Sequence, residues 1–270
     1  MKTYHFIGGL PRSGSSLLCA ILSQRTDTYV TPTSPLLDQI VANQDIWHGL
    51  QTVRANPVPE QLTNITRRMI ESMWQHIHEP IIIDKNRGWA KNMITAEILW
   101  QHPVKMVALV RDLPAIMASW LVLIRNNEKN SVDVELRSKG MQLTDENRMD
   151  IMWNDMVKDC VEGMEVALQQ RPEQVMMVNY KKLVSAPETV LSQIETFLDL
   201  EPYRYQLDNI QSRHKDDDLT AWGMSGMHTV RSTLQSTEKD PRDILGEELF
   251  CKYYDIMQTF RPYRQIYDVL

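Results

Sequence analysis

The chain contains few cysteines, and their arrangement suggests no shared purpose. Its 270 residues include three, Cys19, Cys160 and Cys251, which are far apart and odd in number. They match neither the spacing of a metal site nor a disulfide framework. No signal-like apolar segment follows Met1, and no run is long and apolar enough to span a bilayer. These absences predict a cytoplasmic protein without a membrane span or a metal.

The sequence also lacks an excess of positive charge. It has 29 Lys and Arg against 35 Asp and Glu, a formal net charge of −6, and a pI of about 5.7. A basic surface is the usual footprint of a nucleic-acid-binding protein, so nucleic acid is not expected as a partner. An anionic ligand would need a local basic site. Neither an internal repeat nor a linker-like tract divides the chain, which predicts one domain over residues 1–270.

The amino-terminal segment has the pattern of a strand, a glycine-containing loop and a helix. Tyr4 to Ile7 is rich in aromatic and β-branched residues, and apolar residues recur at helical spacing from Ser16 onward. Exposed N–H groups at a helix start bind phosphate-like anions, and glycines let the backbone approach them. The segment therefore predicts an anion-binding loop. The alternative is a turn between a strand and a helix that binds nothing.

This loop departs from the ATP-binding pattern at one position. Gly9 to Ser16 fits the spacing G-x-x-x-x-G-K-[ST], but Ser15 occupies the lysine position. That lysine reaches the terminal phosphates of a nucleoside triphosphate, so its absence argues against an ordinary ATPase or kinase. The loop carries its cation earlier, at Arg12, together with the hydroxyl groups of Ser13, Ser15 and Ser16.

Three later segments are also predicted to be strands, and each is followed by polar residues. They are Pro80–Asp84, Val104–Val110 and Val175–Tyr180. Ligands of open α/β sheets bind outside the carboxyl ends of the strands, where unpaired polar groups avoid burial. Because a helical pattern follows each strand, we expect an α/β protein, a three-layer P-loop-like domain with a mostly parallel central sheet flanked by helices.

Most of the chain between these strands is predicted to be helical. Residues 36–78 have a helical pattern, a long helix is expected from Thr144 to about Gln170, and another from Ile244 to Phe260. Two stretches are rich in turn-forming or polar residues. They predict a turn-rich loop over residues 26–35 and an exposed loop over residues 126–139.

Two motifs carry a resemblance to a known family. Pro11 to Ser16 resembles the 5′-phosphosulfate loop of sulfotransferases that use 3′-phosphoadenosine 5′-phosphosulfate (PAPS). Arginine at position 12 is typical of the tyrosylprotein and many bacterial members, whereas cytosolic members have lysine. Arg111 at a strand end, followed eight residues later by Ser119, is similar to the motif that grips the 3′-phosphate. Arginine suits that task because its donors form a fork.

The resemblance implies roles for individual residues. The cofactor-binding residues that it implies are Arg12, Ser13, Gly14, Ser15, Ser16, Arg111, Ser119, Tyr180 and Arg231. The catalytic residues that it implies are Arg12, Lys85, Asp84 and His228. Arg231 and His228 belong to Gly223–Arg231, which is similar to a late loop of a bacterial group. Tyrosylprotein members carry a catalytic glutamate in the segment after the first helix, and this chain has none there, so the base stays open.

The resemblance therefore implies a PAPS-dependent enzyme. It would move a sulfuryl group to a hydroxyl or amine acceptor by in-line transfer and release adenosine 3′,5′-bisphosphate (PAP). Two alternatives stay open: a P-loop phosphotransferase that uses ATP, and a non-catalytic nucleotide-binding protein on the same fold. The candidate acceptors are a small molecule, a carbohydrate or a peptide. Neither the acceptor nor the oligomeric state follows from the sequence.

Overall fold

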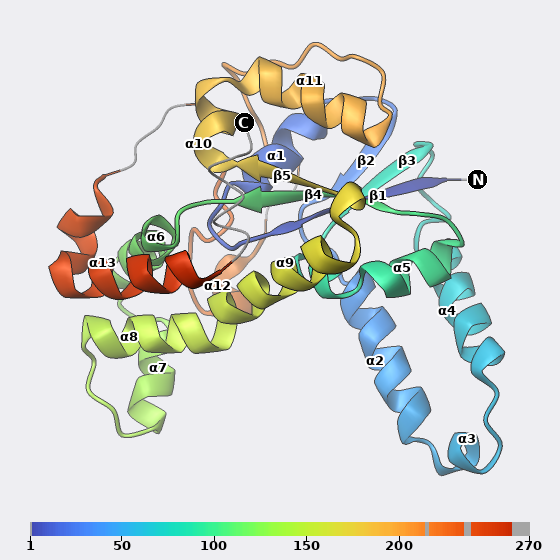
Figure 1. Cartoon of the computed structure of the whole chain (residues 1–270), viewed down its shortest axis with the longest axis horizontal. Helices are drawn as coiled ribbons and strands as arrows, with labels where there is room; N and C mark the ends of the chain where they lie inside the picture. The colour runs from blue at the N-terminus through green and yellow to red at the C-terminus, as the bar shows by residue number, and fades with distance from the viewer. Residues whose placement is uncertain (1, 214–215, 235–238, 261–270) are drawn as a thin grey trace.

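A sheet of five parallel strands lies at the centre of the computed structural model, which describes residues 2–213, 216–234 and 239–260 (Figure 1). The strand order is β2–β3–β1–β4–β5. The bounds are β1 Thr3–Gly9, β2 Thr28–Thr31, β3 Ile81–Lys85, β4 Lys105–Val110 and β5 Val175–Asn179. The four predicted strands and the parallel sheet are therefore confirmed.

Helices cover both faces of the sheet and produce the three predicted layers (Figure 1). One face is covered by α1 (Ser15–Leu22), α10 (Tyr180–Ser185) and α11 (Pro187–Leu198). The remaining helices are α2 (Leu36–Gly49), α3 (Gln51–Ala55), α4 (Pro59–Met73), α5 (Met93–Trp100), α6 (Leu113–Arg125), α7 (Ser131–Ser138), α8 (Asp145–Met152), α9 (Lys158–Gln170), α12 (Asp218–Trp222) and α13 (Pro241–Thr259), with short 3₁₀ helices η1 (Arg87–Lys91) and η3 (Pro172–Gln174) and a π-helical turn η2 (Trp153–Val157).

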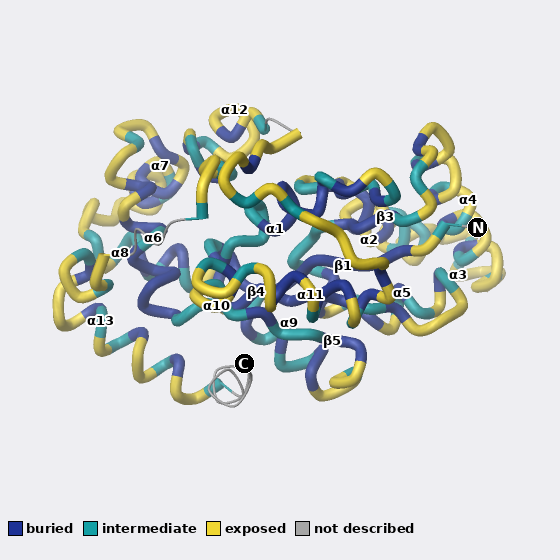
Figure 2. The backbone as a smooth tube through the Cα atoms, turned by 90° about the horizontal axis from the view of Figure 1, so that it is seen from above, coloured by how far each residue is buried: buried dark blue, intermediate teal, exposed yellow. Residues whose placement is uncertain are grey.

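Two hydrophobic cores result, one on each face of the sheet. Neighbouring side chains of a strand point to opposite faces, so Phe6 enters the larger core and Ile7 the smaller one. The rings of Phe6 and Trp89 lie 4.1 Å apart between centroids. Because both faces are covered, the strands appear in the sequence as continuous apolar runs. α13 instead buries one side only: its buried residues Leu245, Leu249, Tyr253 and Met257 lie one turn apart, and the other side of each turn is exposed (Figure 2).

Two expected loops contain regular structure. Residues 26–35 include β2, whose four residues pair in parallel with β3 from Thr28 opposite Ile81 to Thr31 opposite Asp84. Residues 126–139 include α7, whose first turn is capped by the Asn130 side chain. Both loop predictions were wrong. β2 is too short to show a strand pattern and is stabilised by pairing with β3, which is distant in sequence. α7 buries only a narrow stripe, so its sequence is mostly polar.

The order of the strands gathers their carboxyl ends at one edge. β1 lies between β3 and β4, with Ile7 opposite Lys85 and Gly9 opposite Leu109. Gly9 has a φ of 101°, and a Cβ atom there would lie 2.2 Å from the Leu109 carbonyl oxygen. Only glycine fits this close approach. The loops after β1, β3, β4 and β5 therefore meet. Within the described residues, no helix combines the length and apolar character that crossing a bilayer requires.

Candidate active site

A cavity of about 970 Å³ opens where these loops meet. Its wall comes from the β1–α1 loop, β3, α6, α10 and residues 226–234, with further side chains at the start of α13. Cationic side chains dominate its charge. They are Arg12, Lys85, Arg87, Arg111, Arg125, Arg231 and Lys239. Asp243 is the one carboxylate among the described lining residues. An acidic protein thus concentrates positive charge in one hollow, as binding of a polyanion requires.

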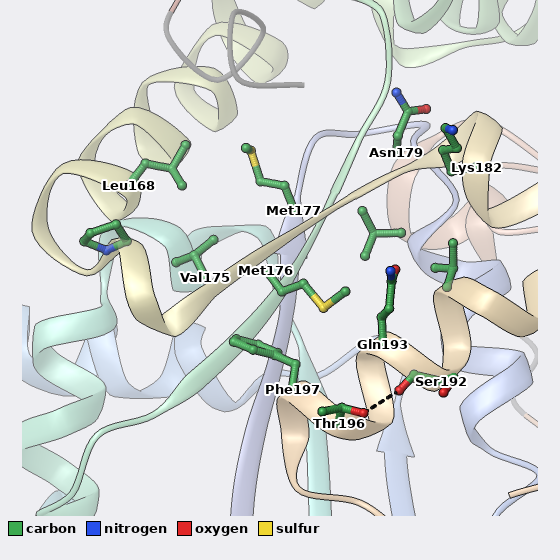
Figure 3. A pocket seen from close by; sticks show the side chains of 13 residues that line it. Leu168, Val175, Met176, Met177, Asn179, Lys182, Ser192, Gln193, Thr196 and Phe197 are labelled. Carbon is green, nitrogen blue, oxygen red and sulfur yellow. Dashed lines mark hydrogen bonds between the residues drawn. The ribbon is translucent and has the colours of Figure 1, made fainter. Parts of the chain in front are cut away.

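A second cavity of about 750 Å³ lies between β5 and α11 and differs in character (Figure 3). Apolar side chains such as Val175, Met176 and Phe197 surround it, and Lys182 carries the only charge among its described lining residues. The polar Thr196 hydroxyl donates to the Ser192 carbonyl within α11, over 3.0 Å. This cavity suits an apolar guest and offers little to a polyanion.

The first cavity brings together most of the predicted site residues. The residues that line it are Arg12, Gly14, Ser15, Ser16, Lys85, Arg111, Ser119, Tyr180, His228 and Arg231. Four of the strand ends contribute, which explains how residues as distant in sequence as Arg12 and Tyr180 share one space. The sequence missed Arg87, Arg125 and Lys239. Arg87 belongs to the polar group after β3, which already pointed to a site.

The β1–α1 loop is held in an uncommon backbone conformation. Arg12 has a φ of 57° and Gly14 a φ of 92°, both in the left-handed region. The Arg111 guanidinium donates to the Arg12 carbonyl over 2.8 Å, which ties this loop to the end of β4. A Cβ atom on Gly14 would lie 2.7 Å from the Tyr180 ring. A bulkier residue therefore cannot replace Gly14 unless Tyr180 moves, and the ring defines one wall of the loop.

The Arg12 side chain reaches across the cavity. Its Nε donates to Ser119 Oγ over 3.1 Å, and its Nη1 donates to the Met227 carbonyl. The guanidinium also lies over the Trp120 ring, 5.5 Å from the centroid. Burial, and secondarily the charge of Arg111, lower the pKa of Arg12 to about 10, so the group is charged at neutral pH. Arg12 thus connects the β1–α1 loop with α6 and with residues 226–234, which form the late segment of the cavity wall.

Arg111 and Lys85 provide two further charges. The Arg111 guanidinium lies over the Tyr180 ring at 4.9 Å from the centroid, a cation–π contact. Lys85 is the last residue of β3 and lines the cavity. Burial lowers the pKa of its ammonium group, and the nearby Arg87 acts in the same direction. The charges of Asp216 and Asp218 oppose this lowering without reversing it.

Two predicted site residues do not reach the cavity with their side chains. Asp84 is completely buried, accepts from Thr31 Oγ1 over 2.9 Å and from Trp89 Nε1 over 2.8 Å, and has a pKa that burial raises. Both oxygens are engaged in the core, so this placement does not support Asp84 as the base. The buried Ser13 hydroxyl donates to the Leu10 carbonyl and lies 3.1 Å from that of Leu109. It fixes the loop and is not among the residues that line the cavity.

His228 enters the cavity from the late segment and is held by acidic residues. Its Nδ1 lies 2.6 Å from Asp218 Oδ1 and 3.5 Å from Asp216 Oδ2. Burial and the charge of Lys85 lower the pKa of His228, while the two aspartates oppose them, and the lowering prevails. No sequence pattern reveals this grouping, because the aspartates precede His228 by ten residues or more and belong to no motif.

The fold and the cavity define an α/β protein with a cationic cavity at the carboxyl edge of its parallel sheet. Its β1–α1 loop has Ser15 at the position where an ATP-binding loop has lysine, and it carries its cation at Arg12. Residues 5–204 match the family model described as "Sulfotransferase family". The chain therefore belongs to the sulfotransferase family and is an enzyme of sulfuryl transfer.

Individual proteins are similar to this chain in sequence or in fold. A Caenorhabditis briggsae protein named "Putative protein-tyrosine sulfotransferase" is 24% identical over 253 residues, which cover 93% of this chain and 85% of that protein. A mouse sulfotransferase, SULT7A1 complexed with PAP, has a similar fold, with a TM-score of 0.59, 11% identity and coverage of 100% and 90% of the two chains. The sulfotransferase domain from the curacin biosynthetic pathway has a TM-score of 0.51, 18% identity and coverage of 97% and 92%.

Proposed function

We propose that this enzyme uses PAPS as its sulfuryl donor and transfers the group to a hydroxyl or amine acceptor. The observation that carries the proposal is the cavity at the strand ends, where seven cationic side chains gather in a protein of net charge −6. PAPS bears phosphate and phosphosulfate groups on two sides of one nucleoside. A cavity with cations from several strand ends matches that distribution of charge better than a single phosphate loop does.

The residues present fit such a ligand. Gly14 stands at the N-cap of α1 in the left-handed conformation, and Ser15 and Ser16 line the cavity beside it. In the proposal this region and Arg12 hold the 5′ side. Arg111 and Ser119 hold the 3′-phosphate, the guanidinium through paired donors. Arg231 is a further phosphate contact.

Tyr180 and Lys85 complete the assignment. The Tyr180 ring, already packed against Gly14 and Arg111, offers a face to the adenine. When bound, PAPS supplies the sulfuryl group, and PAP is the leaving group. In the proposal, Arg12 and the Lys85 ammonium group stabilise negative charge at the transferring group, because electrostatic interactions are strong in a partly buried cavity.

The name of the Caenorhabditis briggsae relative points to tyrosine as an acceptor worth testing first. A phenolic hydroxyl must lose its proton during transfer, so a tyrosine acceptor requires a base in the cavity. No glutamate stands in the β2–α2 segment, where the tyrosylprotein members carry theirs. The proposed acceptor class is therefore a hydroxyl or amine compound, with a tyrosine peptide as the first member of the panel.

Transfer from sulfur-labelled PAPS to such a panel tests the proposal. We expect label on at least one acceptor and an equal release of PAP. The Lys85→Ala variant should lose about two to three powers of ten in rate, as when one donor to a developing charge is removed. Lys182→Ala is the matched control, because Lys182 lines the other cavity and should not affect the rate. Binding of PAP without transfer to water or any acceptor would favour the non-catalytic alternative.

A further inference from the structure

We propose that Asp218 is a positioning residue that makes His228 the general base of this enzyme. The inference rests on the proposed function and assigns the proton-accepting group that the sequence left open. Two observations carry it. His228 lines the same cavity as Arg12 and Lys85. Its Nδ1 is hydrogen-bonded to the buried Asp218 carboxylate, which leaves Nε2 as the ring nitrogen without that contact. Asp84, the other candidate, lies in the core with both oxygens engaged.

The contact between the two residues fixes the tautomer of the ring. His228 Nδ1 lies 2.6 Å from Asp218 Oδ1, and an ionised carboxylate only accepts hydrogen bonds. Nδ1 therefore carries a proton and donates it. In a neutral imidazole the other nitrogen, Nε2, is then an acceptor. This is the form that a general base needs.

Asp218 also fixes the orientation of His228. Its second oxygen, Oδ2, accepts from the His228 backbone N–H over 2.9 Å, so one carboxylate holds both the backbone and the ring of the same residue. Asp218 is only 8% exposed and begins α12, which gives the carboxylate little freedom. Asp216 reinforces the arrangement at 3.5 Å from Nδ1. The Thr33 hydroxyl donates to Asp216 over 2.7 Å and connects this group to the β2–α2 loop.

Burial favours the neutral form of the His228 ring. Burial, and secondarily the charge of Lys85 on β3, lower the pKa of His228, whereas Asp218 and Asp216 raise it, and the net effect is a lowered pKa. A neutral ring can accept a proton. In the step, Nε2 takes the O–H proton of the acceptor while the acceptor oxygen forms a bond to sulfur. The sulfur–oxygen bond to the leaving bisphosphate breaks with its electron pair, so atoms and charge balance.

The first test observes the ring directly and needs no substrate. Histidine ¹⁵N NMR of the full chain at neutral pH should show Nδ1 protonated and Nε2 unprotonated in His228, with His228→Ala assigning the signal. Asp218→Asn should mix or reverse the two tautomers of His228, because the asparagine amide N–H can then face Nδ1 and favours an Nδ1 without a proton. Asp217→Asn is the control. Asp217 is the exposed neighbour of Asp218, and an asparagine side chain can still accept the hydrogen bond from the Thr220 N–H that caps α12. A protonated Nε2 in the unaltered chain, or a spectrum that Asp218→Asn leaves unchanged, would overturn the proposal.

The second test follows PAP release from PAPS with the tyrosine peptide and with water as acceptors. His228→Ala should lower the rate by about 10²- to 10⁴-fold, the usual contribution of a general base, with unchanged affinity for PAP. Added imidazole should restore part of it. In Asp218→Asn the acidic limb of the pH–rate profile should move to lower pH, because the lost charge raised the pKa of His228. A purely structural role for Asp218 predicts no such movement.

Two results would decide against the dyad in different ways. Full activity of His228→Ala would overturn it outright. The ligand atoms of Asp216, Asp218 and His228 lie within 4.8 Å of one another, so stoichiometric shifts of the His228 signals on adding Zn²⁺ or Mg²⁺, with loss of activity in chelator, would replace the base by a cation site. Absence of PAP binding to the unaltered chain would instead refute the proposed function, and the NMR result would still decide the state of His228.

Discussion

At the scale of single residues, the anion loop depends on backbone shapes that few residues accept. Glycine at position 14 is visible in the sequence and explains a φ of 92°. Arg12 adopts a φ of 57° without that freedom, which costs on the order of 1–3 kcal/mol. The contact from Arg111 to the Arg12 carbonyl helps to hold this conformation. The strain is placed at the residue that we assign to the transferring group.

Replacing Gly14 tests the fit of this loop against Tyr180. Gly14→Ala should cost more than the roughly 1–2 kcal/mol that any non-glycine residue loses in the left-handed region, because the new Cβ would lie 2.7 Å from the ring. Gly140→Ala is the matched control: Gly140 has a φ of 67° but no atom within 4 Å of the added carbon. Urea unfolding measures both. Equal losses of unfolding free energy in the two variants would show that the Tyr180 ring moves aside at no cost.

Asp84 provides a residue-scale test of which carboxylate takes part in catalysis. Asp84→Asn should keep the rate of PAP release from PAPS within about threefold, since Asp84 does not line the cavity and an amide can still bond to Thr31 and Trp89. Asp84→Ala should lose about 1–3 kcal/mol of stability, because the buried Trp89 N–H would be left without an acceptor. A collapse of activity in stable Asp84→Asn would return Asp84 to the role of base.

At the scale of elements, the sequence predicted what its own periodicity contains. The four long strands are continuous apolar runs, and both faces of each are covered. β2 was not predicted, because its four residues form no recognisable strand pattern in the sequence and become a strand only by pairing with β3. The same limit applies to side-chain direction. Strand alternation sends Asp84 into the core and Lys85 toward the cavity, and no pattern in the sequence reveals which of the two faces holds the ligand.

β1 also gives the protein an acid-sensitive point far from the cavity. Burial, with the charge of Lys105, lowers the pKa of His5 to about 4, against 6.5 in an unfolded chain. The unfolded chain therefore takes up the proton first. The stability from the neutral buried ring is complete above pH 6.5 and is lost as the pH falls toward 4, by about 3 kcal/mol. His5→Gln should lose about that much less stability than the unaltered chain between pH 7 and pH 4 in urea unfolding. Identical losses would contradict this assignment.

At the scale of the whole molecule, the site residues at the strand ends could be predicted from the sequence, whereas Asp218, in a later segment, could not. Four parallel strands place the strand-end residues, because their carboxyl ends must share an edge: Lys85 ends β3, and Arg12, Arg111 and Tyr180 follow β1, β4 and β5. Asp218 comes from a segment that folds back over that edge more than a hundred residues after β4, and no spacing rule relates it to the earlier motifs. The cytoplasmic location and the single domain over residues 1–270 remain predictions.

The distribution of charge is the property on which the proposed function depends most. The net charge of −6 would repel a nucleotide at long range, while the cavity concentrates cations. Binding through this cavity should weaken as salt rises, because the Debye length falls to about 10 Å at 0.1 M ionic strength. A nucleotide held mainly by its base would show little of that dependence.

Calorimetric titration of the full chain with PAP, adenosine 5′-monophosphate and Mg-ATP tests whether the cationic cavity binds the nucleotide part of PAPS. We predict a clear preference for PAP over both, with the PAP affinity falling about 10- to 100-fold in Arg111→Ala, the loss expected for charge-assisted hydrogen bonds. Arg68→Ala is the control, because Arg68 is an 84% exposed side chain on α4. Preference for Mg-ATP, or binding of none of the three by folded protein, would refute PAPS as the sulfuryl donor.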